Sequence, residues 1–347
     1  MRRVLLVGWG AVGDTVHAIP AIAALRTHLG RDGEIWVESF LTSRGGVAPH
    51  ETAAPHILAP LGLVDRIGHR VVPGGRLGIA LIEALVWRAV LGRRFDHIVM
   101  LMPFAAQPAL LTLAARWSRR VCLMADPATG AAPADDRPLC WHLLETLRRQ
   151  RIAEVPAAAS AAPFLVPPEA AVRESAAWLE RHRRHPDRRL VAIAPDASYP
   201  ANRWPTERFV ALAQALEASG EHEVVLCGGT NAVVTCREIA ARCPEVLVSA
   251  GELSILGAAA LFRQCAAFIG LDTGTTHLAA ACGVRYVAIY GQRGTGRWYY
   301  PPCPTGVVLQ RDVPCRQCWL THCDQPGHPC LAGIDVEDVL DALRAVI

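Results

Sequence analysis

Short apolar runs alternate with longer segments of helical periodicity through the first 125 residues. Residues 4–7 and 34–40 are apolar enough to form buried strands, and residues 16–28 between them fit a helix. The alternation continues with an expected strand at 96–102, a helix at 109–116 and a strand at 120–124. Strands interleaved with helices predict an α/β fold in which helices cover both faces of a parallel sheet.

The same alternation restarts after a segment rich in Ala and Pro, residues 153–168, which we interpret as a linker. A charged helix is expected at 169–185. Further helices are predicted at 206–219 and 232–243, and further strands at 190–194, 223–227, 266–271, 284–290 and 306–310. Residues 335–347 have the apolar spacing of an amphipathic helix.

These patterns predict two doubly wound, Rossmann-like domains with a ligand cleft at the carboxyl ends of their strands. We assign residues 1–160 to the first domain and residues 161–335, with a Cys-rich segment at 315–330, to the second. The last helix, 336–347, is expected to pack back on the first domain. A length of 347 residues agrees with two domains.

Composition narrows the class of protein. The 35 basic and 32 acidic residues nearly balance and are scattered, so a nucleic-acid partner is not expected. The one dense basic run, residues 181–189, is interpreted as a solvated helix end, with an anionic membrane surface as the weaker alternative. The longest uncharged stretch, residues 98–115, is divided by Pro103 and Pro108, which favours strand, loop and helix over a membrane span. No secretory signal is visible, so we expect a cytoplasmic protein, with contact at the inner face of the membrane as an option.

The first turn, Gly8 to Gly13, matches G-x-G-x-x-G after a strand and before a helix, with Glu38 near the end of the next strand. This context is typical of NAD(P) sites, and an oxidoreductase is therefore one alternative function. Asp14 opposes it, because a carboxylate at the helix N-terminus would repel a pyrophosphate. Asp14 can be a helix N-cap, a general base that the helix terminus keeps ionised, or both.

The second half contains three polar turns, each at the end of an expected strand. Asp272 to His277 continues into a helix, an arrangement that directs backbone N–H groups at an anion. Residues 195–205 contribute Ser198, Asn202 and Arg203, and residues 228–231 supply glycines. Convergence of these turns at one sheet edge predicts a nucleotide diphosphate site.

Several motifs resemble glycosyltransferase family 9, the ADP-heptose:lipopolysaccharide heptosyltransferases, in the same order along nearly the whole chain. They are Gly13-Asp14…His17…Pro20, then Arg203-Trp204-Pro205-x-x-Arg208-Phe209, Gly228-Gly229, and Asp272-Thr273-Gly274…His277-Leu278-x-Ala280-Ala281. The resemblance implies a GT-B fold and an inverting, metal-independent transfer of a sugar, with heptose from ADP-heptose as the expected donor and a lipopolysaccharide core or related glycan, lipid-linked or not, as acceptor.

The resemblance also implies roles for individual residues. Asp14 would deprotonate the acceptor hydroxyl, Asp272 would bind hydroxyls of the donor sugar, and Thr273, Gly274 and His277 would hold the diphosphate. We include among the donor-binding candidates Ser198, Asn202, Arg203, Gly229, Thr230, Leu253 and Thr275. Two positions depart from the family: Asn202 replaces a usual Lys, and the residues after Gly229 lack the usual acidic side chain.

Twelve cysteines occur in the chain, and four of them are crowded into sixteen residues: Cys315, Cys318, Cys323 and Cys330. The C-x2-C start is typical of metal sites, whereas the second pair is spaced irregularly for a zinc ribbon. Similar segments occur in the resembled family, and a related autotransporter branch holds iron with cysteines. A structural zinc or iron ion and a reduced Cys-rich loop both remain open, and no cofactor is expected for the chemistry. A protein heptosyltransferase of the autotransporter type and a nucleotide-sugar-binding protein without turnover also stay open.

Overall fold

The protein is described from a computed structural model that covers residues 3–43, 52–92, 94–101, 113–115, 117–118, 120–123, 137–155, 163–292, 305–315, 318 and 320–347. The chain forms two compact units, Met1–Ala161 and Ala162–Ile347. Each unit contains a sheet in which every described strand pair is parallel. The two parallel α/β sheets expected from the alternation of elements are confirmed.

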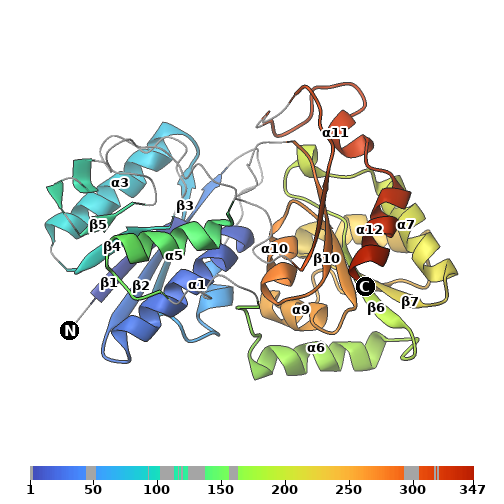
Figure 1. Cartoon of the computed structure of the whole chain (residues 1–347), viewed down its shortest axis with the longest axis horizontal. Helices are drawn as coiled ribbons and strands as arrows, with labels where there is room; N and C mark the ends of the chain where they lie inside the picture. Colours follow the sequence, from blue (N-terminus) through green and yellow to red (C-terminus); the bar gives the residue numbers. More distant parts are fainter. Residues whose placement is uncertain are drawn as a thin grey trace. The chain divides into compact units, whose positions relative to one another are not determined.

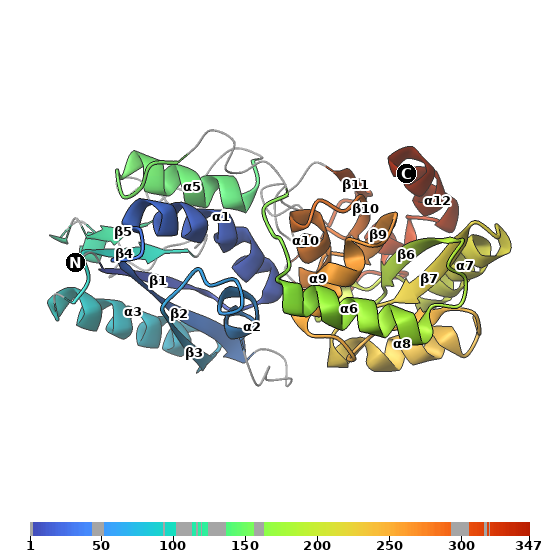
Figure 2. The same cartoon turned by 90° about the horizontal axis from the view of Figure 1, so that it is seen from below.

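The first unit has a sheet of order β3-β2-β1-β4-β5. Its strands are β1 (Arg3–Trp9), β2 (Glu34–Ser43), β3 (Arg66–Pro73), β4 (His97–Met100) and β5 (Val121–Cys122). Its helices are α1 (Val12–Leu29), α2 (Ala54–Leu58), α3 (Arg76–Leu91) and α5 (Leu139–Arg149). Helices α1 and α5 cover one face of the sheet and α3 covers the other (Figures 1 and 2). Alternate β1 residues Leu5 and Val7 pack into the core on the α3 side.

The second unit has a sheet of order β11-β10-β9-β6-β7-β8. Its strands are β6 (Arg189–Ala194), β7 (His222–Leu226), β8 (Leu247–Val248), β9 (Ala267–Leu271), β10 (Tyr286–Tyr290) and β11 (Gly306–Gln310). Its helices are α6 (Glu169–His182), α7 (Thr206–Ala218), α8 (Val233–Ala240), α9 (Ile255–Phe262), α10 (Gly274–Ala281), α11 (Pro329–Ala332) and α12 (Val336–Val346), with single turns η1 (Pro200–Asn202) and η2 (Thr230–Ala232).

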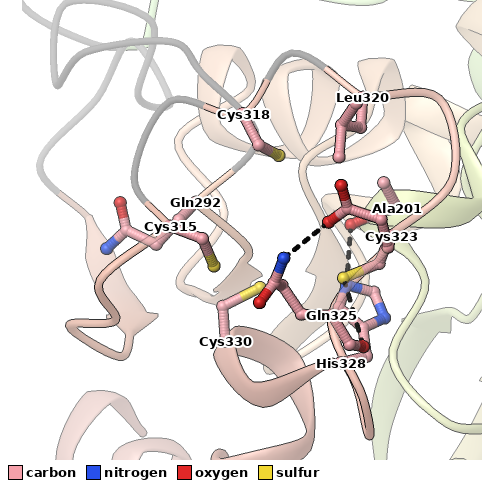
Figure 3. Close-up of a pocket in the computed structure, with 10 residues that line it drawn as sticks. Ala201, Gln292, Cys315, Cys318, Leu320, Cys323, Gln325, His328 and Cys330 are labelled. Carbon is pink, nitrogen blue, oxygen red and sulfur yellow. Dashed lines mark hydrogen bonds between the residues drawn. The ribbon is translucent and has the colours of Figure 1, made fainter.

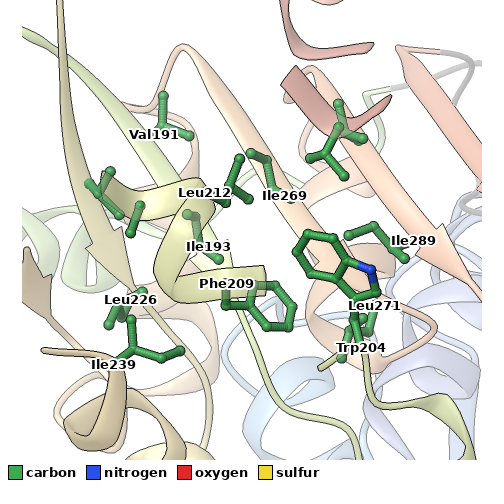
Figure 4. Close-up of a cluster of buried hydrophobic side chains, with 14 of the residues drawn as sticks. Val191, Ile193, Trp204, Phe209, Leu212, Leu226, Ile239, Ile269, Leu271 and Ile289 are labelled. Carbon is green, nitrogen blue, oxygen red and sulfur yellow. The ribbon is translucent and has the colours of Figure 1, made fainter. Parts of the chain in front are cut away.

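On one face of the second sheet a core lies between the strands and helices α7, α8 and α12. Val191 and Ile193 of β6 and Ile269 and Leu271 of β9 meet Phe209 of α7 there (Figure 4). Trp204 is fully buried in this core and its indole nitrogen donates to the carbonyl of Ile334, 2.9 Å away. This bond ties the loop after β6 to the start of α12.

Helix α12 corrects one expectation. Its Val339 and Leu343 are buried in the core of the second unit, where the helix contacts α7 and β10. The helix therefore packs on the second unit and not on the first, as we had expected. Its start is fixed by reciprocal capping between Asp335 and Asp338.

Some predictions fall partly outside the described residues. Of the helix expected at 109–116, residues 113–115 are helical, whereas residues 109–112 and 116 are not described. Of the strand expected at 120–124, Val121–Cys122 is described as a strand. In the long uncharged stretch, His97–Met100 forms β4, and among the described residues no helix is both long and apolar enough to cross a membrane.

Candidate functional site

The strand order places a switch point between β6 and β9 in the second unit. Strands β6 and β9 are direct neighbours, and the chain runs outward from them in opposite directions across the sheet. In open parallel sheets ligands bind in the crevice at the carboxyl ends of two such strands. The turns that leave β6 and β9 are the polar turns expected to bind a nucleotide diphosphate.

The turn after β9 passes directly into α10. Thr273 is the N-cap residue in extended conformation, although its side chain makes no capping bond, and its hydroxyl lies 2.8 Å from that of Thr275. Thr276 is buried and its hydroxyl donates to the carbonyl of Leu271 at 2.6 Å, so this hydroxyl is used within the turn. Thr273, Gly274 and Thr275 are half-buried at the start of the helix, where first-turn N–H groups attract anions.

His277 lies one turn into α10 and is 1% exposed. Burial lowers the pKa of its imidazole to about 3, because the charged form loses its hydration. The ring is therefore neutral near pH 7, and a neutral imidazole still carries one N–H donor.

Asn202, at the end of η1, joins the loop after β6 to the turn after β9. Its amide nitrogen donates to Asp272, 3.1 Å from Oδ2 and 3.4 Å from the backbone carbonyl. The side chain is 3% exposed, and its Oδ1 is buried without a hydrogen-bond partner among the described residues. A buried acceptor without a partner is rare in folded proteins, so this oxygen is available to a bound ligand. Two of the candidate residues are thus brought together at the switch point.

Asp196 is a site residue that the sequence analysis missed. It follows β6 directly, is 8% exposed, and lies 3.0 Å from Nε of Arg203. Its other oxygen accepts from the amide of Asn231, also at 3.0 Å. This carboxylate therefore links the loops after β6 and β7. The only sequence signal was its type and position, an acidic residue immediately after an apolar strand.

Arg203 is the cation next to Asn202, the position at which the family usually has a lysine. Its Nε donates to the carbonyl of Ala197 at 2.9 Å and lies beside Asp196, so part of its charge is used within the loop. Ser198 is exposed in the same loop. The structure brings Arg203 to Asp196 and not to Asp272.

The turn after β7 contains the remaining donor candidates. A Cβ on Gly228 would come within 2.4 Å of the Ala232 Cβ, so only glycine allows the chain to turn this tightly into η2. Gly229 and Thr230 are exposed, and the N–H of Gly251 donates to the carbonyl of Gly228 at 3.0 Å. That bond brings the segment containing half-buried Leu253 beside the turn.

Asp14 lies at the corresponding place in the first unit. Strands β1 and β4 are neighbours at its switch point, and Asp14 after β1 and Leu101 after β4 line a common pocket. The N-cap of α1 is Ala11, so Asp14 is the third helical residue and the N-cap interpretation is wrong. The carboxylate is half-buried in the first turn, where the helix dipole favours its ionised form. His17, one turn along, is fully buried.

Gly10 has a packing role in the glycine-rich turn. A Cβ there would lie 2.5 Å from the Ser39 hydroxyl and from Cβ of Thr52. Its N–H and carbonyl bond the backbones of Phe40 and Ala53, both at 2.7 Å. Close backbone packing therefore accounts for this glycine without a dinucleotide.

The four clustered cysteines line one pocket together with Gln292 and His328 (Figure 3). Burial, and to a smaller extent the nearby Cys323 and Cys315, raises the pKa of Cys330. In the described part of the chain, however, no three His, Cys, Asp or Glu side chains are arranged to hold a metal ion.

Two parallel α/β units of this kind make up the GT-B class of glycosyltransferases, the fold class expected from the sequence. Within that class the chain belongs to glycosyltransferase family 9 (heptosyltransferase), whose model matches residues 84–325. This membership favours a glycosyltransferase over the NAD(P)-dependent oxidoreductase.

Individual relatives agree with the family. The chain is 28% identical to lipooligosaccharide heptosyltransferase 2 of Haemophilus influenzae over 169 residues, which is 46% of this chain and 48% of that protein. The chain thus spans about half the length of this curated relative.

Solved structures show the same fold over the full chain. A family 9 glycosyl transferase from Veillonella parvula has a TM-score of 0.70 at 16% identity, covering 99% of this chain and 97% of the other. The E. coli ADP-heptose lps heptosyltransferase II has a TM-score of 0.64 at 20% identity, covering 100% and 98%.

Proposed function

We propose that this protein is an inverting glycosyltransferase that moves heptose from ADP-heptose to a hydroxyl of lipopolysaccharide core or a related glycan. The observation that carries the proposal is the Asn202–Asp272 pair, which joins two polar turns at the switch point of the second unit. Family membership and the names of the relatives support the donor and the acceptor class. A protein acceptor of the autotransporter type is the alternative acceptor.

Donor binding is assigned to the three turns of the second unit. The N-terminus of α10, with the hydroxyls of Thr273 and Thr275, is suited to the diphosphate. Oδ1 of Asn202 is an acceptor that a hydroxyl of the donor can satisfy, and Asp272 beside it can accept a second. Ser198, Arg203, Gly229, Thr230 and Leu253 lie on the loops around this crevice. Helix-terminus N–H groups can stabilise the charge that develops on the leaving diphosphate. The proposed transfer therefore uses no metal ion.

Asp14 is proposed as the general base. Its half-buried carboxylate lines the pocket at the switch point of the first unit and can accept the proton of the acceptor hydroxyl as that oxygen attacks the anomeric carbon. The bond to the diphosphate breaks as the new glycosidic bond forms on the opposite face, which inverts the anomeric configuration. We propose that the sugar transfer takes place in the cytoplasm.

A structural zinc or iron ion is also proposed for Cys315, Cys318, Cys323 and Cys330. Four thiols lining one pocket supply the donor chemistry that both metals prefer. Because no three of these described side chains are arranged around a common point, binding an ion would require them to turn toward one another. The ion would act on stability and not on the transfer.

The test of the mechanism is Asp14→Asn. Asparagine keeps the size of the side chain but cannot take the proton, so we expect kcat with ADP-heptose to fall roughly 100- to 10,000-fold. Affinity for ADP, whose site we assign to the second unit, should stay unchanged. Steady-state rates with ADP-heptose and a lipopolysaccharide acceptor, together with calorimetric ADP binding, measure both quantities.

Asp32→Asn, in an exposed loop of the same unit, is the matched control and should retain full activity. An unchanged kcat for Asp14→Asn would remove Asp14 from the mechanism. Thermal stabilisation by NAD, with none by ADP or ADP-heptose, would instead favour the oxidoreductase.

A further inference from the structure

Helix α3 has an apolar face on the outside of the first unit. Leu77, Leu81 and Leu91 are 61%, 48% and 64% exposed. With Ala84 and Arg88, which are also exposed, they follow the spacing i, i+4, i+7, i+11, i+14 of a single helix face. The opposite side of α3 is buried against the sheet through Ile82, Val86 and Val90. A helix that is apolar on both sides is normally covered on both sides.

The exposed apolar surface continues beyond the helix. Trp117 and Leu113 are 64% and 53% exposed, and the Trp117 ring lies 5.9 Å from the ring of Trp87 on α3. We call Leu77, Leu81, Leu91, Leu113 and Trp117 the α3 patch. The described residues contain only four other large hydrophobic side chains of comparable exposure, which are Val71, Val166, Val172 and Val234. The patch is therefore a local concentration and not the general character of the surface.

The exposed charged side chains of α3 have one sign. Arg76 and Arg88 on α3 are exposed, and neither forms an ion pair with another described residue. The only acidic residue of the helix, Glu83, is 8% exposed and faces inward, and burial raises its pKa toward the neutral form. By contrast, the basic run after α6 is compensated, since Arg183, Arg184 and Arg189 pair with Glu223, Glu245 and Glu221.

We propose that the α3 patch is a docking surface for an anionic lipid bilayer, with α3 lying in the plane of the membrane. Exposed leucines with an arginine before them and another among them, together with an exposed tryptophan, suit the boundary between headgroups and acyl chains. Sixteen residues of helix are about 24 Å long, which is short for a span but suits an in-plane orientation.

The charge argues against a second copy of this chain as the occupant. A two-fold dimer would place the same patch on both partners. Arg76 and Arg88 of one copy would then approach the same residues of the other, and like charges oppose such a contact. An anionic surface attracts both arginines.

The experiment is sedimentation of the full-length protein with vesicles of phosphatidylcholine containing one-third phosphatidylglycerol, and with vesicles of pure phosphatidylcholine. We expect binding to the anionic vesicles only, and weaker binding as salt is raised. Leu77→Gln with Leu81→Gln should reduce the partition roughly tenfold or more. Arg76→Gln with Arg88→Gln should reduce it by a similar factor and remove most of the salt dependence.

Val172→Gln with Val234→Gln is the matched control, because these exposed valines lie on helices α6 and α8 of the second unit. All three double variants should melt at the wild-type temperature. Equal vesicle binding by the wild type and the leucine variant would overturn the proposal. A second result would also overturn the proposal. In it, the wild type binds no vesicles but runs as a dimer in gel filtration, and the leucine variant runs as a monomer.

The inference does not rest on the proposed function, and the two can fail separately. The leucine variant should transfer heptose to a soluble, delipidated acceptor at the wild-type rate. If the wild type binds anionic vesicles but transfers no heptose, the proposed activity is rejected. The proposed membrane-docking surface is then still supported.

Discussion

His277 is a buried residue of a type whose side chain, when exposed to water, titrates near neutral pH. Its imidazole has a pKa near 3 in the folded protein, because burial penalises the cation. In the unfolded chain the same group has a pKa of about 6.5. The unfolded state therefore binds more protons than the folded state between these two values. Stability from this residue is complete above pH 6.5 and is lost as the pH falls toward 3.

We expect His277→Gln to remove this acid sensitivity. When the pH is lowered from 7 to 5, the unfolding free energy of the wild type should fall by roughly 2 kcal/mol because of His277. The variant should not show this fall. Urea unfolding at the two pH values measures the difference. His69→Gln, at an exposed position on β3, should behave as the wild type. A wild-type protein that loses no more stability than His277→Gln on acidification would show that the ring titrates normally.

At the scale of elements, Ala201 connects the loop after β6 to the Cys-rich segment, residues 315–330. The N–H of Ala201 donates to the carbonyl of Thr321 at 3.0 Å, and its carbonyl lies 3.1 Å from Nε2 of His328 (Figure 3). The next residue, Asn202, is the one that bonds Asp272. The segment therefore supports the loop that carries part of the proposed donor site.

If the segment holds a metal, elemental analysis of the purified protein should find about one zinc or iron ion per chain. Cys315→Ser should then lose that ion and lower the melting temperature, because structural metal binding is coupled to folding. Cys265→Ser, at a half-buried cysteine just before β9 and outside the Cys-rich segment, serves as the control for metal content. Metal-free protein that melts at the same temperature in both variants would identify a reduced Cys-rich loop.

The elements that the sequence analysis missed have physical reasons. Edge strand β3 contains Arg66, His69 and Arg70 and is mostly exposed, so it lacks the apolar run of a buried strand. Helix α3 is apolar on nearly every face, which hides the 3.6-residue period. Strands such as β6 and β9, buried on both faces, are continuous apolar runs and were predicted within one or two residues.

At the scale of the whole molecule, the two-unit α/β architecture follows from local patterns, but the site needs the strand order. Asn202 and Asp272 are 70 residues apart and meet because β6 and β9 are neighbours. Asp196 reaches Asn231 because β7 lies on the other side of β6. No local pattern gives that order. The candidates at strand ends could therefore be named from sequence, whereas the pairings among them could not.

The division of the chain into two compact units has a consequence for heat denaturation. A ligand stabilises the folded state that it contacts, by roughly 2.7 kcal/mol at one hundred times its dissociation constant. ADP held by the turns of Ala162–Ile347 would add this free energy to one unit and leave Met1–Ala161 as it was. We expect the calorimetric endotherm to broaden or divide when ADP is added, with only the component from the second unit moving to higher temperature. A single peak that moves as a whole would show that the two units unfold together.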